Sequence, residues 1–458
     1  MLKSNIAWMK KNVPSDLKVW KGMIQDIDWS QVAAKTKLSL QRDKDRITAE
    51  FKEFAAMDTS AKIDWLMNGD RHLGYLYKKD AIAFARREWK GLKSVGYDFV
   101  GWLKIWGGML NMVMKDPVSI MLAVFEYHWF ASYLATPAVV DRSVFGRRGK
   151  LLQADFDMWV AITHWAEDLI ANLIMADAKI GGNQKINKRI IMFDEMTMAQ
   201  MMAGFPNLLG IPYQMIPVFM VSEMDQLTLI PYIDAIESYG LPSDTCPLPT
   251  AECGCAVKDE YPMCGQGFIA SSMPCDGSVM ATSFQDRRFS KFMPSYPLCM
   301  PVRYDDEDTT EMAAADMKDC IHWVEGLTGE TWNWDTYFAT MEKMNECTRL
   351  EMEKWEINKT HYPQLVGSSF ELFRKWNYEM DGGLFPEGLK TQRKICKTMM
   401  ETYEKKLPAY VGGYEKYRAL IWSCPAHFYA NFSNWLANCW GIYALTEMEA
   451  LNMTKMLN

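Results

Sequence analysis

Short apolar runs alternate with helix-like stretches in the second half of the chain, and this alternation constrains the fold more than any other feature. The apolar runs are bounded by Pro, Gly or charged residues and read RIIMF, MIPVFMV, GFIASSM and LCMPVRY. Between them lie stretches with helical spacing, such as DQLTLIPYIDAIESYG and SVMATSFQDRRFSKFM. Strands that alternate with helices predict a parallel sheet with helices on its faces. We therefore expect an α/β fold from about residue 188 onward.

Two cysteines follow elements of this predicted sheet. In a parallel sheet, ligands bind beyond the carboxyl ends of the strands, where the loops collect. Cys275 lies in the loop PCDGS, which follows the predicted strand GFIASSM, and Cys246 follows the GLPSD turn at the end of a predicted helix. Two thiols on loops of one sheet indicate a shared pocket.

The first half of the chain has the pattern of an α-helical bundle. Its segments include TAEFKEFAAMDTSAKIDWLMNG and DAIAFARREWKGLKSVGYDFVGWLKIWGGMLNMVMK. Apolar residues recur in them three and four positions apart, with few β-branched residues. The turn-rich stretch AKIGGNQKINKR, where Gly181 and Gly182 are good helix terminators, places a domain boundary near residue 185.

Charge and the N-terminal sequence limit the partners and the compartment. The chain has 50 basic and 57 acidic residues, a net charge of -7, and no dominant basic run. Nucleic acid is therefore excluded as a main partner. The start, MLKSNIAWMKKNVPSDLKVW, lacks the apolar core and the cleavage site of a secretion signal, which predicts a cytoplasmic protein. The stretch 117–140 is nearly long enough to cross a bilayer, but it contains Glu126 and His128 at its centre, so a buried helix is favoured over a membrane span.

The cysteines are confined to the second half of the chain. None of the eleven precedes Cys246, and five lie within CPLPTAECGCAVKDEYPMCGQGFIASSMPCDGS, residues 246–278. A reducing cytoplasm disfavours a disulfide framework. Cys253, Cys255 and Cys264 offer a C-x-C pair and a later thiol for a structural zinc ion, without a second close pair. Burial as small apolar side chains explains Cys347 and Cys439 better than it explains loop cysteines. Residue spacing alone does not decide whether these cysteines bind zinc, bind an iron–sulfur cluster or are simply buried.

Three stretches in this half resemble one known family. YIDAIESYGLPSDTC, GFIASSMPCDGSVMATSFQDRRF and YPLCMPVRYDDED are similar in order and spacing to the subunits of the 2-hydroxyacyl-CoA dehydratase and benzoyl-CoA reductase family. The similarity continues through GETWNWDTYFATMEKMNECTRLEMEKWEI and, more weakly, YRALIWSCPAHF. It covers about residues 186–458.

The resemblance implies a fold and a chemistry. Each family subunit has two flavodoxin-like α/β halves, and the cleft between them holds a 4Fe–4S cluster on three cysteines. A separate ATP-hydrolysing iron–sulfur activator delivers one electron at very low potential. In dehydratases that electron makes a ketyl radical of the acyl-CoA thioester, which expels the 2-hydroxyl group, and in reductases two electrons reduce an aromatic ring. The open iron of the cluster would act as a Lewis acid. A second homologous subunit is the expected partner.

The resemblance also implies cluster ligands. Cys246 matches the second family ligand and Cys275 the third, whereas Ile233 occupies the position of the first. The nearest replacement thiols are Cys255 and Cys264, with Cys253 beside them. Glu195 lies in the segment IIMFDEMTMAQMMAG, which corresponds to a family segment near the substrate carbonyl. We expect Glu195 either to act as a base or to orient the thioester, or else to be an acidic helix start.

These observations lead to a combined prediction. We expect an N-terminal helical region (1–185), a cluster-bearing α/β domain (186–375) and the start of a second, incomplete α/β half (376–458). The expected function is the iron–sulfur subunit of an (R)-2-hydroxyacyl-CoA dehydratase, a hydro-lyase. An aromatic acyl-CoA reductase subunit, or another low-potential reductase of this family, is the first alternative. A non-catalytic assembly subunit with structural or zinc-bound cysteines is the second. The sequence contains no P-loop motif, so we expect any ATP dependence to come from another protein.

Overall fold

The structure is a computed structural model of all 458 residues. The residues that it describes are 28–69, 90–144, 147–193, 199–224, 227–271, 276–299, 306–365, 386–407, 415–421 and 436–447, with the single residues 25, 301, 373, 409 and 432.

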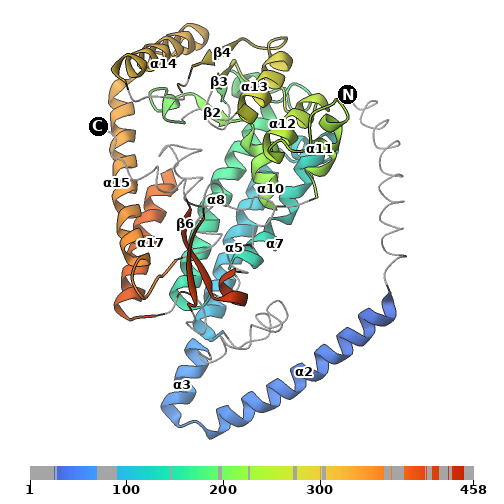
Figure 1. The fold of residues 1–458 in the computed structure, drawn as a ribbon, viewed down its shortest axis with the longest axis vertical. Helices are drawn as coiled ribbons and strands as arrows, with labels where there is room; N and C mark the ends of the chain where they lie inside the picture. Colours follow the sequence, from blue (N-terminus) through green and yellow to red (C-terminus); the bar gives the residue numbers. More distant parts are fainter. Residues whose placement is uncertain are drawn as a thin grey trace.

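A four-stranded parallel sheet forms the centre of the α/β part (Figure 1). Its strands are β1 (Ile190–Phe193), β2 (Leu209–Pro212), β3 (Gly267–Ser271) and β4 (Ser295–Leu298). They are arranged in the order β2-β1-β3-β4, and every neighbouring pair is parallel. This is the order of the first four strands of a flavodoxin-like sheet. The predicted α/β class is therefore confirmed, as are the strands predicted in RIIMF and GFIASSM.

The strand predicted in MIPVFMV is wrong. Residues 215–221 form a π-helical turn, η4 (Met215–Phe219), which continues into α10 (Met220–Met224). A short apolar run buried on all sides looks alike whether it is strand or helix, and Pro217 has no N–H to donate to a sheet ladder. The second strand lies instead in LGIP. The last strand is SYPL, which ends at Leu298 where the predicted run LCMPVRY begins.

Each face of the sheet packs on a different set of helices. Ile190 and Met192 point into the main core, and Ile191 and Phe193 point into a second cluster on the opposite face. The second cluster is covered by α14 (Glu307–Thr328). The two central strands, β1 and β3, are buried throughout, and their residues are therefore predominantly apolar.

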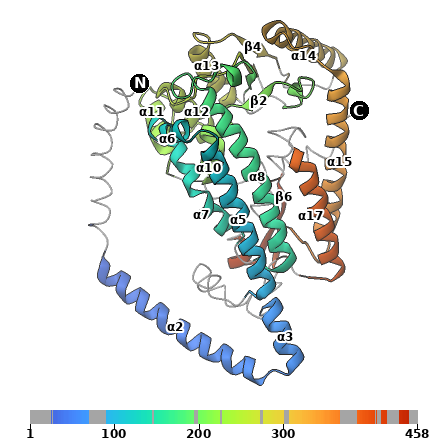
Figure 2. The ribbon, with the colours of Figure 1, turned by 180° about the vertical axis from the view of Figure 1, so that it is seen from behind.

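The N-terminal helices are α2 (Trp29–Ala56), α3 (Thr59–Asn68), α5 (Leu92–Lys115), α6 (Pro117–Glu126), the 3-10 helix η2 (His128–Ala135), α7 (Thr136–Ser143) and α8 (Gly149–Ala176). Those from α5 onward share the main core with the sheet, whereas α2 and α3 contribute none of their described residues to it. The long helix α8 runs through the middle of the molecule with α5 along it (Figures 1 and 2). One cluster of buried residues extends from these two helices to β1 and β3.

The segment 117–140 is broken into three pieces, where the sequence predicted one buried helix. The chain becomes extended at Tyr127, and α6, η2 and α7 follow one another around that break. Among the described helices, none alone has the length and apolar composition needed to cross a membrane. Only α5 and α6 taken together pass that test, with a bend of 96° between them.

The remaining elements flank the sheet and α8. The first group comprises η3 (Ala199–Met202), α9 (Gln184–Asn187), α11 (Ile230–Glu237), α12 (Pro247–Val257) and α13 (Asp276–Phe289). The second comprises α15 (Trp334–Asn358), α17 (Pro386–Glu404), β5 (Tyr417–Ile421), the π-helical turn η6 (Leu436–Trp440) and β6 (Ile442–Glu447). Helix α17 packs between α15 and α8, and β5 pairs with β6 in a separate parallel ladder.

Candidate functional site

Cys246 occupies the amino end of α12. It is the N-cap residue, and its carbonyl oxygen accepts hydrogen bonds from the amide (3.2 Å) and the hydroxyl (2.8 Å) of Thr250. Pro247 begins the helix, as proline commonly does at the first helical position. The Cys246 side chain is exposed and makes no capping hydrogen bond. An exposed thiol therefore lies at a helix amino end, where the partial positive charge of the helix stabilises an anion.

Helix α12 lies parallel to α13, the helix that follows β3. Cys253 of α12 and Ala281 of α13 belong to one small buried cluster. Six residues further on, Asp259 forms an ion pair with Arg288 at the end of α13. Because a later residue of one segment contacts a later residue of the other, the two helices run in the same direction. The amino ends of α12 and α13 therefore lie on the same side of the molecule.

The three remaining candidate thiols of this region are buried. Cys255 lies in the main core, close enough to Tyr232 and Tyr261 to affect the pKa values of both phenols. Cys264 lies in the same core with its Sγ 3.6 Å from Sδ of Met192. Burial raises the pKa of both thiols well above the ordinary value, and it raises the pKa of Cys253 to about 12. In this structure the three thiols therefore contribute to packing.

Two predicted site residues lie outside the described residues. Glu195 belongs to the segment 194–198, which follows β1, and Cys275 belongs to the segment 272–275, which follows β3. β1 and β3 are parallel neighbours, so both segments leave the same edge of the sheet. We call it the carboxyl edge. Cys299, which does not match a cluster ligand of the family motifs, follows β4 at this edge and is exposed.

A metal site cannot be assembled from the described side chains alone. Among residues 28–69, 90–144 and the later described ranges, no three His, Cys, Asp or Glu side chains lie close enough to hold one ion.

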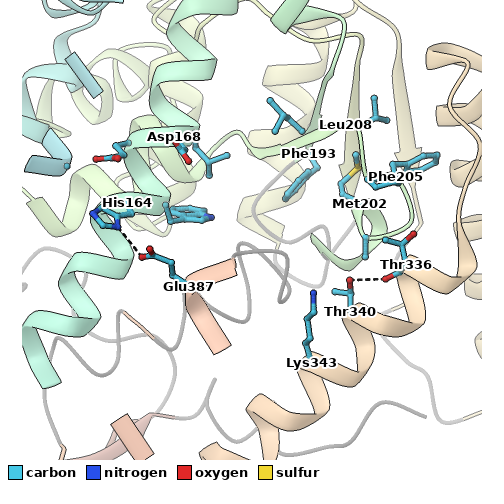
Figure 3. Close-up of a pocket in the computed structure, with 18 of the residues that line it drawn as sticks. His164, Asp168, Phe193, Met202, Phe205, Leu208, Thr336, Thr340, Lys343 and Glu387 are labelled. Carbon is cyan, nitrogen blue, oxygen red and sulfur yellow. Dashed lines mark hydrogen bonds and ion pairs between the residues drawn. The ribbon is translucent and has the colours of Figure 1, made fainter. Parts of the chain in front are cut away.

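A large cavity lies between the sheet and the helices α5, α8, α15 and α17 (Figure 3). Its volume is about 930 Å³, within the range of small-molecule sites. The apolar wall comes from the sheet side and includes Phe193, Met202, Phe205 and Leu208. The polar wall comes from the helices and includes Lys104, His164, Glu167, Lys343 and Glu387. The cavity thus combines an apolar side with charged groups opposite.

Glu167 is the most deeply buried charged residue of the cavity wall. Only 7 % of its surface is exposed, and Nδ2 of Asn111 donates a 3.0 Å hydrogen bond to its Oε1. Its Oε2 has no hydrogen-bond partner within the described part of the chain. Burial raises the pKa of this carboxyl, although Asn111, His164 and Lys115 act in the opposite direction. One carboxylate oxygen is therefore available to a ligand.

Other polar groups lie around the cavity. Nδ1 of His164 on α8 lies 3.0 Å from Oε2 of Glu387 at the start of α17 (Figure 3). Lys104 and Lys343, from α5 and α15, are exposed lysines on two sides of the cavity. Two lysines from different helices at one cavity suit an anionic group such as a phosphate.

The cavity reaches the carboxyl edge of the sheet. Phe193, the last residue of β1, lines the cavity and pairs with Ile269 of β3. Ile269 lies two residues before the end of β3, which is about 7 Å along a strand. The cavity therefore approaches the position where the segment with Cys275 begins.

A sequence profile of the family described as "2-hydroxyglutaryl-CoA dehydratase, D-component" matches residues 226–456. The chain belongs to this family. The resemblance expected from the sequence is therefore confirmed, and the protein is a dehydratase-type component of the 2-hydroxyacyl-CoA dehydratase family. No curated protein matches the chain significantly.

The dehydratase match covers only part of the site. It includes α11, α12, β3 and α13, and the later elements up to β6, whereas β1, β2 and the N-terminal helices precede it. The cavity therefore joins walls from both parts, since α15 and α17 lie inside the match and α5 and α8 outside it. Glu167 could not have been found from the family motifs. Its signal in the sequence is an acidic residue within an apolar helical stretch, and only the structure shows that it is buried and faces Gly108.

Proposed function

We propose that this chain is the iron–sulfur subunit of an (R)-2-hydroxyacyl-CoA dehydratase, which eliminates water from the thioester through a ketyl radical. In this proposal Cys246 and Cys275 are thiolate ligands of a 4Fe–4S cluster at the carboxyl edge. The family match supports the dehydratase type. The cluster, the ligands and the substrate are our proposal.

The parallel packing of α12 and α13 carries the ligand assignment. Cys253 of α12 and Ala281 of α13 lie in one buried cluster, and Asp259, just beyond the end of α12, pairs with Arg288 near the end of α13. The two helices therefore run in the same direction, with their amino ends on the same side. Cys246 caps the amino end of α12, and Cys275 directly precedes α13 in the sequence. We propose on this ground that the two thiols bind the same cluster.

The donor chemistry of this place suits the cluster. Iron–sulfur clusters are held by Cys thiolates, and an exposed thiol at a helix amino end meets that need better than a thiol buried among phenols. When bound, the cluster would supply a Lewis-acidic iron and a path for a low-potential electron. The fully buried Cys255 lies about 13 Å along the helix from Cys246, since the rise is about 1.5 Å per residue. Cys255 and Cys264 stay predictions as third ligand.

We assign the cavity to the acyl-CoA substrate. Its apolar wall at Phe193 and Phe205 suits an acyl chain, and Lys104 and Lys343 suit the phosphates of the coenzyme. The acyl end would point toward the carboxyl edge, because the cavity extends to the last residue of β1. Glu195 lies two residues beyond Phe193 in the sequence, and we propose that it orients the thioester or accepts a proton there.

The electron source would be a second protein. We propose an ATP-hydrolysing iron–sulfur activator together with a homologous partner subunit.

Iron analysis of anaerobically purified protein tests the proposal. We expect near-equal amounts of iron and acid-labile sulfide in the wild type and the loss of both in Cys246→Ser and Cys275→Ser. Cys299→Ser is the matched control, since Cys299 is also exposed and lies at the same edge; it should retain its iron. Zinc without sulfide in the wild type, or unchanged iron in both ligand variants, would contradict the proposal.

A further inference from the structure

Helix α5 has a continuous apolar stripe on the side that faces away from the core. Its buried side consists of Ser94, Gly101, Ile105 and Gly108. On the opposite side, large apolar side chains are between 37 % and 64 % exposed. We call these residues the α5 seam: Leu92, Phe99, Leu103, Trp106, Leu110 and Val113. Such contiguous apolar surface is uncommon on monomers and marks an interaction site.

The α5 seam has the spacing of a coiled coil. Leu92, Phe99, Trp106 and Val113 are seven residues apart, and Leu103 and Leu110 fall between them at the complementary heptad position. A heptad of apolar residues keeps a narrow, straight stripe toward one partner helix. The seam therefore suits another helix better than a loop or a broad surface.

The apolar stripe is straight only along α5. The exposed apolar residues continue from α5 onto α6, where Val118 and Met121 are exposed. The two helices meet at a bend of 96°, so a single straight partner helix covers the part of the stripe on α5 and not the part on α6.

A matching stripe exists on α2 of the same chain. We call the following exposed residues the α2 seam: Trp29, Val32, Leu40, Ile47 and Phe51. They recur on one side of the helix, and at about 1.5 Å per residue the two seams have similar lengths of roughly 30 Å. Helix α2 stands apart from the rest of the molecule in two opposite views (Figures 1 and 2). Within the described residues, no element covers either seam. The two seams are also similar in length, so that one could cover the other.

The corner between α2 and α3 keeps α2 away from the α5 of its own chain. The rings of Phe54 and Trp65 are in contact at 4.9 Å, and the Asp58 carboxylate caps α3 through the amide of Ala61 at 2.8 Å. Helix α3 in turn packs on α5, and Nζ of Lys93 donates to Asn68 at 3.2 Å. A second copy can supply α2 without breaking these contacts.

We infer that α2 of one copy docks on the α5 seam of a second copy, with the reciprocal contact on the other side, to form a symmetric dimer. Exchange of identical elements is a common route to such dimers. The inference does not depend on the proposed function.

Sedimentation of the full-length protein at several concentrations tests the dimer. We expect the wild type to be a dimer. Leu40→Glu places a charge in the α2 seam and Leu103→Glu places one in the α5 seam, and each should raise the dissociation constant of the dimer at least tenfold. Leu38→Glu is the matched control, because Leu38 is also exposed on α2 but lies on its opposite side. It should remain a dimer.

Mixing the two seam variants tests the exchange itself. A dimer of either variant alone has two damaged contacts, whereas a mixed dimer keeps one contact between an intact α2 and an intact α5. The mixture should therefore form mixed dimers that neither variant forms alone. A monomeric wild type, a lack of complementation, or wild-type binding to phospholipid vesicles that Leu103→Glu abolishes would each overturn the inference.

Discussion

A β-carbon at position 108 would lie 2.6 Å from Oε2 of Glu167. Gly108 lies on the buried side of α5, and Glu167 faces it from α8. A glycine inside a helix costs about 1 kcal/mol relative to alanine. The helix tolerates it here because the missing side chain leaves space for a buried carboxylate on the cavity wall.

Alanine at position 108 should therefore displace the Glu167 carboxylate. We expect Gly108→Ala to gain none of the stability that alanine normally adds to a helix, and to weaken acyl-CoA binding. Gly96→Ala on the same helix is the control, since its β-carbon would meet open space. It should raise the free energy of unfolding by about 0.5–1 kcal/mol. Chemical denaturation of both variants measures the difference, and an equal gain in both would disprove the steric explanation.

Glu167→Gln should change how stability depends on pH. Burial raises the pKa of Glu167 in the folded protein. The stabilisation that the protonated Glu167 gives to the fold is therefore fully present below the pKa of this glutamate in the unfolded chain, about 4.5. It is lost as the pH rises through the higher pKa of Glu167 in the folded protein. Glutamine cannot ionise and can keep the bond from Asn111, so the variant should become more stable relative to the wild type as the pH rises from about 4 to 8. Denaturation at a series of pH values measures this, and a constant difference would contradict the raised pKa.

The buried thiols should behave differently from Cys246. Serine at position 255 or 264 places a hydroxyl group in an apolar core, which should lower the free energy of unfolding by about 1–3 kcal/mol. The variant that lacks the third cluster ligand should lose its iron, and the other should keep it. Cys246→Ser should also lose its iron, but the free energy of unfolding of the iron-free protein should change by less than about 0.5 kcal/mol, since the residue is exposed. Unchanged iron in both buried variants would rule out Cys255 and Cys264 as the third ligand.

The side chains of Arg147 and Asp155 form an ion pair, and their contributions to stability should be strongly coupled. The two side chains are almost completely buried with Nε and Oδ2 3.0 Å apart, and Nη1 of Arg147 also donates to the carbonyl of Ala409 at 2.6 Å. Arg147→Met leaves a buried carboxylate without its cation and should cost about 3–5 kcal/mol. The double variant with Asp155→Leu should cost less than the single one. A double-mutant cycle measures the coupling, and additive losses would show that the pair is not a unit.

Local pattern in the sequence was enough for the fold class and the family. The strand at RIIMF, the strand at GFIASSM and the helix over residues 278–289 of the stretch SVMATSFQDRRFSKFM depend on apolar period and on bounding Pro and Gly, which act within one element. The family motifs around Cys246 and Cys275 are likewise local. These features could therefore be predicted.

Only the tertiary structure decided which apolar run is a strand and which residues meet. MIPVFMV forms helical turns in the structure, and a run buried on all sides lacks the periodicity that distinguishes strand from helix. Cys255 and Cys264 are predicted ligands from the sequence, and only the structure shows that long-range packing buries both of them. Glu167, Lys343 and Phe193 meet at one cavity from three distant elements, and no local pattern encodes that contact. Local preference depends on neighbours in the chain, whereas a site depends on neighbours in space.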